Sequence, residues 1–118
     1  MNDLEKFEKR PWGEFHVLLS RDHFKTKWIT VQSGHQLSYQ SHSQREEHWV
    51  IVRGTGVVIV NEVDHPVQAG SYIHIKVQDK HRIKNTGSEP LEFVEVQLGS
   101  YFGEDDIVRY ADDYRRKS

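Results

Sequence analysis

Residues 34–54 contain the strongest candidate metal ligands of the chain, between two glycines. Gln40 and His42 lie two positions apart, so their side chains point to the same face if this segment is a β-strand. Glu47 follows a polar run that is typical of a turn, and it opens an apolar strand at residues 49–52. Such a turn allows the carboxylate to fold back over the imidazole.

A second segment, residues 70–85, supplies a further imidazole. A strand and a polar turn precede His81, which stands at the head of another strand. Gln40, His42, Glu47 and His81 together offer oxygen and nitrogen donors without sulfur, a set that suits a borderline divalent metal. The sequence therefore predicts a metal site, and the alternative is a pair of hydrogen-bonded strand histidines beside an ordinary polar glutamine.

Three neutral ligands and one carboxylate leave a divalent ion with net positive charge, which can polarise a carbonyl and stabilise an enediolate. Isomerisation of a 2-hydroxy aldehyde needs this stabilisation and also a separate base, because a metal-bound carboxylate is a poor base. The candidate bases are His48, Glu46, Glu95 and Glu104. If Glu47 faces inward, strand parity turns His48 outward unless the turn continues past it.

Basic side chains near the predicted ligands are candidates for binding an anion. Arg45 shares strand parity with Glu47 and suits a phosphate or an enediolate oxygen. Arg109 and Lys80 are further candidates. The alternative for Arg45 is a solvated turn arginine, and the alternative for Arg109 is a surface salt bridge. For Lys80 the alternative is an exposed strand charge. The residues to which we assign catalytic roles are Arg45, His48 and Arg109.

Composition narrows the class of protein. At 118 residues the chain has the size of one domain, and its 16 basic against 18 acidic residues give no general attraction to nucleic acid or anionic membrane. The absence of cysteine excludes disulfides and thiolate metal sites and fits a cytoplasmic protein. The first ten residues lack an apolar signal region, and no apolar run approaches the ~20 residues that span a bilayer. We expect neither a nucleic acid nor a membrane partner.

Nine short segments rich in β-branched and aromatic residues predict an all-β sandwich or barrel. Gly54 marks a hairpin, and Pro66 indicates an edge strand. Residues 1–10 read as a polar arm or short helix, and residues 103–118 as a charged segment that is helical or irregular. The predicted strands are residues 14–19, 24–31, 35–42, 48–52, 56–60, 65–68, 71–75, 81–85 and 91–97.

The strand at residues 48–52 is apolar on both faces. Trp49 and Ile51 share one face, and Val50 and Val52 share the other. Both faces must be covered, one by a second sheet and the other by a partner subunit. The sequence therefore predicts a homodimer.

The spacing of the predicted ligands resembles the two motifs of the cupin family. The pattern G-x5-[H/Q]-x-H-x4-E-x6-G is met in full, and G-x5-P-x-G-x2-H-x3-N is met except at Lys76 and Gln78. The residues that meet the two patterns are Gly34, Gln40, His42, Glu47 and Gly54, and Gly70, His81 and Asn85.

Longer stretches resemble the type II mannose-6-phosphate isomerases, which commonly form the C-terminal domain of bifunctional mannose-1-phosphate guanylyltransferases. They include RPWG at residues 10–13, the run at 24–31, R-x-EHW at 45–49, LEFVEVQ at 91–97 and GEDDIVRY at 103–110. The resemblance implies one cupin domain over residues 1–118, a double-stranded β-helix barrel with a short charged C-terminal segment. It also implies a metal, usually zinc, with manganese, iron, cobalt and nickel as alternatives.

The resemblance implies interconversion of mannose 6-phosphate and fructose 6-phosphate, a step toward GDP-mannose and surface polysaccharide. Gln36 stands where the family often has lysine, and it shares parity with Gln40, so we expect it at the substrate together with Lys80 and Glu95. The chain has no Gly-rich phosphate loop, so a separate nucleotidyltransferase is the expected partner for nucleotide chemistry.

Two other functions compete with the isomerase. A non-catalytic cupin that binds or senses a sugar or sugar phosphate fits Gln36 and the lack of an obvious base. A cupin dioxygenase or decarboxylase normally uses three histidines and a redox-active metal, and Gln40 counts against it.

Overall fold

Eleven β-strands and no helix make up the part of the chain that the computed structural model describes, residues 6–111. Many of the strand residues are β-branched or aromatic, types that pack well on a pleated, half-buried surface. No helix in these residues is long and apolar enough to cross a membrane. The strands are β1 (Lys6–Arg10), β2 (Gly13–Ser20), β3 (Phe24–Val31), β4 (Tyr39–Ser41), β5 (Arg45–Arg53), β6 (Thr55–Val60), β7 (Val63–Gln68), β8 (Tyr72–Ile75), β9 (His81–Asn85), β10 (Leu91–Gly99) and β11 (Val108–Ala111).

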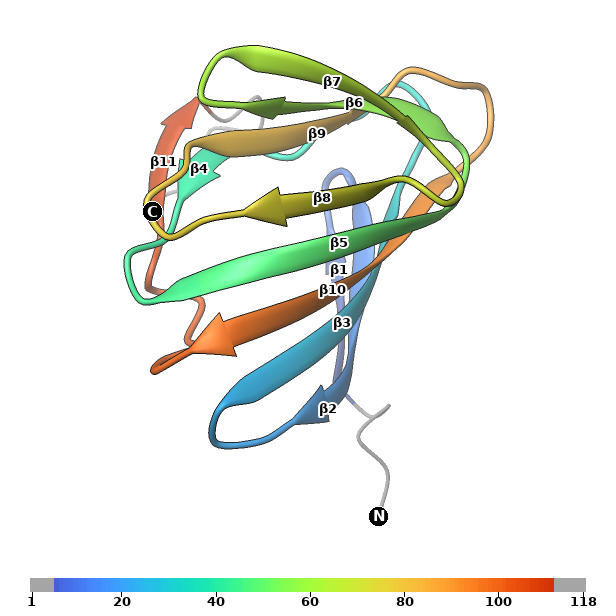
Figure 1. The fold of residues 1–118 in the computed structure, drawn as a ribbon. Coiled ribbons are helices and arrows are strands. Elements are labelled where there is room, and N and C mark those ends of the chain that lie inside the picture. The colour runs from blue at the N-terminus through green and yellow to red at the C-terminus, as the bar shows by residue number, and fades with distance from the viewer. Residues whose placement is uncertain (1–5, 112–118) are drawn as a thin grey trace.

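The strands form two antiparallel sheets around one core. The larger sheet has the order β1-β2-β3-β10-β5-β8, and the smaller has the order β11-β4-β9-β6-β7. In Figure 1, strands β8, β5, β10, β3 and β2 lie one below another, with β9, β6 and β7 above them. From β3 to β5 and from β8 to β11 the chain alternates between the sheets, which is the winding of a jelly-roll barrel. The predicted all-β fold is confirmed.

The interior changes from apolar to polar along the strands. Ile51 on β5 and Phe93 on β10 are cross-strand partners and are fully buried. Two inward positions further along, Glu47 and Gln97 are partners and are buried to the same degree. Trp49 lies between the two regions, with its ring 4.6 Å from that of Phe93. The apolar half provides the hydrophobic core, and the polar half is available for a site.

Two local predictions about turns and edges are confirmed. Gly54 joins β5 to β6 with a φ of 89°, and a Cβ there would lie 2.7 Å from the Pro90 carbonyl oxygen. Both the positive φ and the lack of space for a Cβ therefore require glycine at this position. Pro66 lies on β7, which pairs only with β6 among the described strands and forms an edge, where the missing N–H costs no ladder bond.

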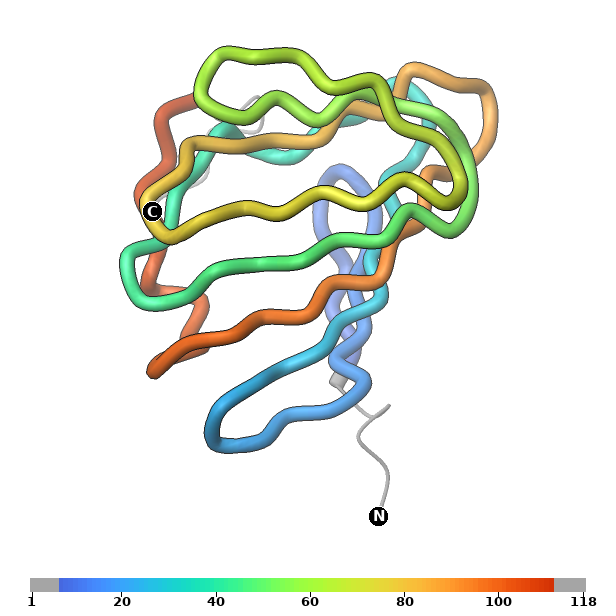
Figure 2. Tube along the Cα trace, viewed as in Figure 1, coloured from blue at the N-terminus to red at the C-terminus, as the bar shows by residue number. Residues whose placement is uncertain are grey.

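Both predictions for the chain ends are corrected within the described residues. Residues 6–10 form β1, paired with β2, rather than an arm or helix. Val108–Ala111 forms β11, paired with β4, so the helical alternative for 103–118 is wrong there. Figure 2 shows the chain after β10 turning back along the barrel to reach β11. Residues 1–5 and 112–118, including the basic run at 115–117, lie outside the described part.

The predicted strand at residues 35–42 is shorter than expected. Its regular part is β4 (Tyr39–Ser41), and Gln36 forms an isolated bridge with Lys84 of β9. The segment nevertheless runs along β9 of the smaller sheet, from the Gln36 bridge to the pairing of Gln40 with His81, and His42 follows directly after β4.

Candidate metal centre and pocket

A pocket occupies the polar end of the barrel, with a volume of about 680 Å³ including the part open to solvent. Both sheets line it, and the segment that leads into β11 lines it as well. The pocket brings together all four predicted metal ligands, Gln40, His42, Glu47 and His81. Three further predicted site residues, Arg45, Glu95 and Arg109, also line it.

Three of the predicted ligands converge within the pocket. One ligand atom each from His42, Glu47 and His81 lies within 4.8 Å of the others. Glu47 Oε2 is 3.5 Å from His42 Nδ1, and Glu47 Oε1 is 3.9 Å from His81 Nε2. All three side chains are buried, so the group is enclosed by protein rather than solvated.

The two histidines are neutral, which is the form that binds a metal. Burial lowers the pKa of His42 to about 4 and also lowers the pKa of His81. The His81 Nδ1–H donates to the Asp79 carbonyl oxygen at 2.9 Å, so Nε2 keeps its lone pair toward Glu47. A hydrogen bond of this kind orients a metal-ligating histidine and fixes its tautomer.

Glu47 is a buried carboxylate held by two donors. Burial alone raises its pKa, but the Arg45 guanidinium and the two histidines outweigh burial and hold the pKa below its usual range. Trp49 Nε1 donates to Oε1 at 3.0 Å, and Arg45 Nε donates to Oε2 at 2.8 Å. The ring of Trp49 thus closes the apolar side of the site while its N–H orients the carboxylate.

Gln40 completes the donor set. It lies directly opposite His81 in the pairing of β4 with β9. Its Nε2 donates to the Ser38 hydroxyl at 3.1 Å, so the amide oxygen is the atom that could bind a metal. Two imidazoles, a carboxylate and an amide oxygen fit a borderline divalent cation, so these residues can hold a metal.

Arg45 bonds two of the ligands in this structure. Its Nη2 donates to His42 Nε2 at 3.1 Å, in addition to the bond from Nε to Glu47. Its Nη1 is buried and has no hydrogen-bond partner among the described residues. The guanidinium therefore supplies positive charge beside Glu47, and a cation bound at His42 Nε2 requires it to release that bond.

Glu95 is a second buried carboxyl group in the pocket. It lies opposite Trp49 in the pairing of β10 with β5 and is 4% exposed. Burial and the neighbouring Glu47 carboxylate raise its pKa to about 8. Gln97 Nε2 donates to it. A carboxyl group that titrates near neutral pH can give and take a proton at the substrate.

The pocket carries an excess of positive charge. Five cationic side chains and three carboxyl groups line it among the described residues. Lys27 is buried and pairs with Glu104 at 2.6 Å, and Arg82 Nε donates to the Leu37 carbonyl oxygen at 2.9 Å. The cationic residues are Arg10, Lys27, Arg45, Arg82 and Arg109.

Arg10 and Lys27 are assigned no role in the sequence analysis, although strand alternation indicates that Lys27 points inward. Lys27 alternates with Ile29 and Val31, which are buried, so it points inward on β3. A lysine at an inward position of a strand is unusual enough to indicate a site. Arg10 ends β1, a strand that the sequence pattern does not predict, so strand alternation carries no comparable indication for it.

The segment before β11 is fastened over the pocket by Asp106. Its carboxylate accepts from the Ser43 hydroxyl at 2.8 Å and from the backbone N–H groups of Ser43 and Gln44 at 3.1 Å and 3.0 Å. These bonds tie the segment to the turn between His42 and β5. Glu104 and Arg109 reach the pocket from either side of this attachment.

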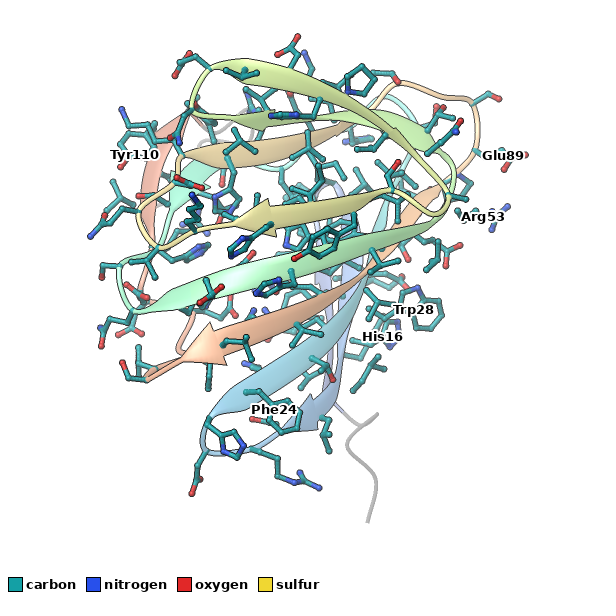
Figure 3. The ribbon with its side chains drawn as sticks, viewed as in Figure 1. His16, Phe24, Trp28, Arg53, Glu89 and Tyr110 are labelled. Carbon is teal, nitrogen blue, oxygen red and sulfur yellow. The ribbon has the colours of Figure 1, made fainter. Side chains whose placement is uncertain are left out.

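Three predicted site residues lie elsewhere. β5 already begins at Arg45, so His48 points to the outer face, where it contacts Glu46 at 2.9 Å, and its assignment as a catalytic residue is corrected. Gln36 and Lys80 do not line the pocket. The Lys80 ammonium instead lies 4.6 Å from the ring centre of Tyr110, the residue labelled beside β11 in Figure 3.

The sequence of the chain is similar to those of several known proteins. A family model described as mannose-6-phosphate isomerase C-terminal matches residues 2–112. The alginate biosynthesis protein AlgA of Pseudomonas putida is 43% identical over 117 residues, which cover 99% of this chain and 24% of that protein. A mannose-1-phosphate guanylyltransferase of Klebsiella pneumoniae is 43% identical over 107 residues, covering 91% and 23%. The chain thus spans about a quarter of the length of these curated relatives.

A solved structure supports the fold. An uncharacterized protein with a double-stranded β-helix domain from Klebsiella pneumoniae superimposes with a TM-score of 0.72 at 20% identity, covering 83% of each chain. At this identity the likeness establishes the cupin barrel and not the chemistry.

Proposed function

Because the chain belongs to the mannose-6-phosphate isomerase C-terminal family, we propose that it is a metal-dependent isomerase that interconverts mannose 6-phosphate and fructose 6-phosphate. The observation that carries the proposal is the pocket itself. It gathers His42, Glu47 and His81 beside Glu95, a buried carboxyl group with a pKa near neutral. The alternative of a redox-active cupin gains no support from this ligand set.

The metal would be held by Gln40, His42, Glu47 and His81, and zinc suits these donors best. Such an ion supplies positive charge beside the sugar carbonyl, where negative charge develops during the reaction. Trp49 and the apolar half of the barrel exclude water from the inner wall of this site.

Glu95 is proposed as the group that moves the proton between the two sugar carbons. Of the four candidate bases, Glu46 and His48 lie on the outer face, whereas Glu95 and Glu104 line the pocket. Glu104 is half exposed and already paired with Lys27. Glu95 is buried and has a pKa of about 8, so it is the better candidate for the base.

The phosphate is proposed to bind among the pocket cations. Arg45 offers a buried donor without a partner among the described residues, and Arg109 enters from β11. An arginine fork matches phosphate oxygens well, and an electropositive pocket raises the local concentration of an anionic substrate.

The names of the relatives suggest a pathway. AlgA is named for alginate biosynthesis and the Klebsiella protein for guanylyl transfer to mannose 1-phosphate. We propose that this chain provides mannose 6-phosphate for a route that leads to GDP-mannose and polysaccharide. A nucleotidyltransferase is its proposed partner.

A homodimer belongs to the same proposal. Trp28, Val50 and Val52 are exposed by 38%, 44% and 48% on the outer face of the larger sheet. His16 stacks on Trp28 with ring centres 4.9 Å apart, and Figure 3 shows the two side by side on the outside of the barrel. Size-exclusion chromatography with light scattering should give twice the chain mass, and monomer alone at micromolar concentration would exclude the dimer.

A coupled assay for fructose 6-phosphate tests the activity. Purified chain supplied with Zn²⁺, Mn²⁺ or Co²⁺ is expected to convert mannose 6-phosphate, and His81→Ala should not. Calorimetric binding of mannose 6-phosphate without turnover under any metal would replace the isomerase with a non-catalytic sugar-phosphate binder. Neither binding nor turnover would reject both.

A further inference from the structure

A second group of metal-ligating side chains lies on the outer face of the larger sheet, away from the pocket. His48 on β5 and His74 on β8 are direct cross-strand partners, so their side chains leave the same face side by side. Glu46 precedes His48 by two positions on β5 and shares that face. Glu47, between them, points the opposite way into the barrel, so the sheet separates this group from the pocket.

The three side chains already converge on one atom. The Nε2 atoms of His48 and His74 lie 2.9 Å and 2.7 Å from the same carboxylate oxygen, Glu46 Oε1. The two rings are stacked with centres 4.4 Å apart and an interplanar angle of 12°. One ligand atom from each residue lies within 4.8 Å of the others, a separation that small side-chain rotations close to metal-binding distance.

A hydroxyl group orients one of the imidazoles. Tyr72, two positions before His74 on β8, places its hydroxyl 2.6 Å from His48 Nδ1. When a metal replaces the bond from Nε2–H to Glu46, Nδ1–H can donate to this oxygen, and Nε2 then carries the lone pair that faces the other two ligands. Metal-binding histidines ordinarily have such a partner on the second ring nitrogen.

Access from solvent is open. The side chains of His48, His74 and Glu46 are 26%, 37% and 37% exposed, so an ion can enter and keep water in its remaining positions. The cluster is four residues along β5 from Val52, about 13 Å in an extended strand. The proposed dimer face also includes Val50, two residues from His48, so the cluster lies at the margin of that face, beside the edge strand β8.

We propose that Glu46, His48 and His74 form a second metal site, on the outer surface of the barrel, for a borderline divalent cation such as Zn²⁺, Ni²⁺ or Cu²⁺. Two imidazoles and one carboxylate are the ligands these ions prefer, and three protein ligands with open positions make an exchangeable site. β8 is an edge strand, paired within its sheet only to β5 among the described strands. The bound ion therefore cross-links this edge to its neighbour.

Equilibrium dialysis with Zn²⁺ tests the site by difference. Wild-type chain is expected to bind one equivalent more than His74→Ala, whether or not the pocket is loaded, so the result does not depend on the isomerase proposal. His65→Ala, which removes an exposed histidine of β7, is the matched control and should bind as wild type does. Equal stoichiometry in wild type and His74→Ala would overturn the proposal.

Two further readouts separate ligation from a general effect on structure. Zn²⁺ should raise the melting temperature of wild type more than that of His74→Ala, whose own fold is checked by circular dichroism. Tyr72→Phe should keep the stoichiometry and weaken Zn²⁺ binding roughly tenfold, since it removes only the orienting hydroxyl. Unchanged Zn²⁺ affinity in Tyr72→Phe would show that the hydroxyl does not orient His48. If circular dichroism shows that His74→Ala is not folded as wild type is, Glu46→Gln replaces it in the dialysis experiment.

Discussion

At the scale of single residues, the pocket contains two buried carboxyl groups, Glu47 and Glu95, whose pKa values are shifted in opposite directions. Glu47 is held ionised by Arg45, and Glu95 is held protonated by burial and by Glu47 itself. Two carboxyl groups whose pKa values are pushed apart are a common arrangement in acid–base catalysis. In the proposed mechanism, Glu47 serves as a metal ligand and Glu95 as the proton carrier.

Glu95→Gln tests that division of roles. The amide keeps the shape and the bond with Gln97 but cannot carry a proton, so kcat should fall by about 100-fold or more while KM and metal content stay near wild type. Steady-state kinetics and metal analysis on the same sample measure both. Glu104→Gln is the matched control and should lower kcat far less; the reverse order would move the base to Glu104.

The same group predicts how the stability of the metal-free chain depends on pH. The pKa of Glu95 is raised from 4.5 to about 8, so the folded state holds a proton that the unfolded state releases between these values. Stability from Glu95 is therefore complete below pH 4.5 and is lost as pH rises toward 8, by up to about 1.4 kcal/mol per pH unit.

His42 acts in the opposite direction at lower pH. Its folded pKa of about 4 lies below the ordinary 6.5, so its contribution is complete above pH 6.5 and is lost as pH falls toward 4. Urea unfolding in EDTA should thus show wild type losing stability relative to Glu95→Gln between pH 6.5 and 8. Parallel curves in that range would contradict the buried, protonated state of Glu95.

Arg45→Met separates the structural role of this residue from its role in the site. Without metal, the variant leaves Glu47 buried beside no guanidinium, a change that typically costs about 3–5 kcal/mol. A bound cation replaces the lost charge, so Zn²⁺ should raise the melting temperature of the variant more than that of wild type. If Zn²⁺ raises the melting temperature of the variant by the same amount as that of wild type, or by less, the metal does not replace the charge that Arg45 places beside Glu47.

At the scale of elements, the segment between β10 and β11 is part of the site rather than a charged tail. Asp106 ties it to the turn that follows His42, and β11 pairs with β4 at the predicted ligand Gln40. Glu104, Ile107 and Arg109 line the pocket, so the chain closes one wall of it with residues from the last quarter of the described part.

Asp106→Ala should loosen this wall. The two backbone N–H groups and the hydroxyl lose their acceptor, so KM for the sugar phosphate should rise several-fold and stability should fall by about 1–3 kcal/mol. Asp105→Ala, in the same segment but bonded to Tyr101, is the matched control. Equal KM values for the two variants would mean that the segment does not shape the substrate site.

Strand alternation explains how much of this could be predicted from sequence. Gln40 and His42, then Glu47, follow a strand, a turn and a strand, so local periodicity alone places their side chains. The same rule predicts the outward position of His48, because β5 begins before it. The barrel, and the inward positions of the predicted ligands, are therefore accessible from the sequence.

The remaining parts depend on contacts between distant residues. Lys27 meets Glu104 across 77 positions, and no local pattern reports that pairing. The acidic start and basic end of residues 103–118 are typical of a helix, but pairing with β4 fixes 108–111 as a strand. Tertiary pairing overrides local preference at both ends of the described chain, and both ends reach the pocket.

At the scale of the whole molecule, the barrel separates two environments. Its interior holds a pocket with neutral histidines, a carboxylate and an excess of cations, and its outer face holds an exposed His-Glu-His cluster and the apolar row that we propose as the dimer contact. A single sheet, with alternating side chains on β5, serves both faces.

The location of bound metal tests this account most directly. Anomalous diffraction from crystals of the zinc-loaded chain should show a peak inside the barrel within about 2.0–2.2 Å of ligand atoms from His42, His81 and Glu47, with the Gln40 amide oxygen completing the set. Arg45 should have left His42 Nε2 in that structure. A pocket that shows no peak at saturating zinc, with Arg45 still bonded to His42, would contradict the metal centre and the isomerase mechanism built on it.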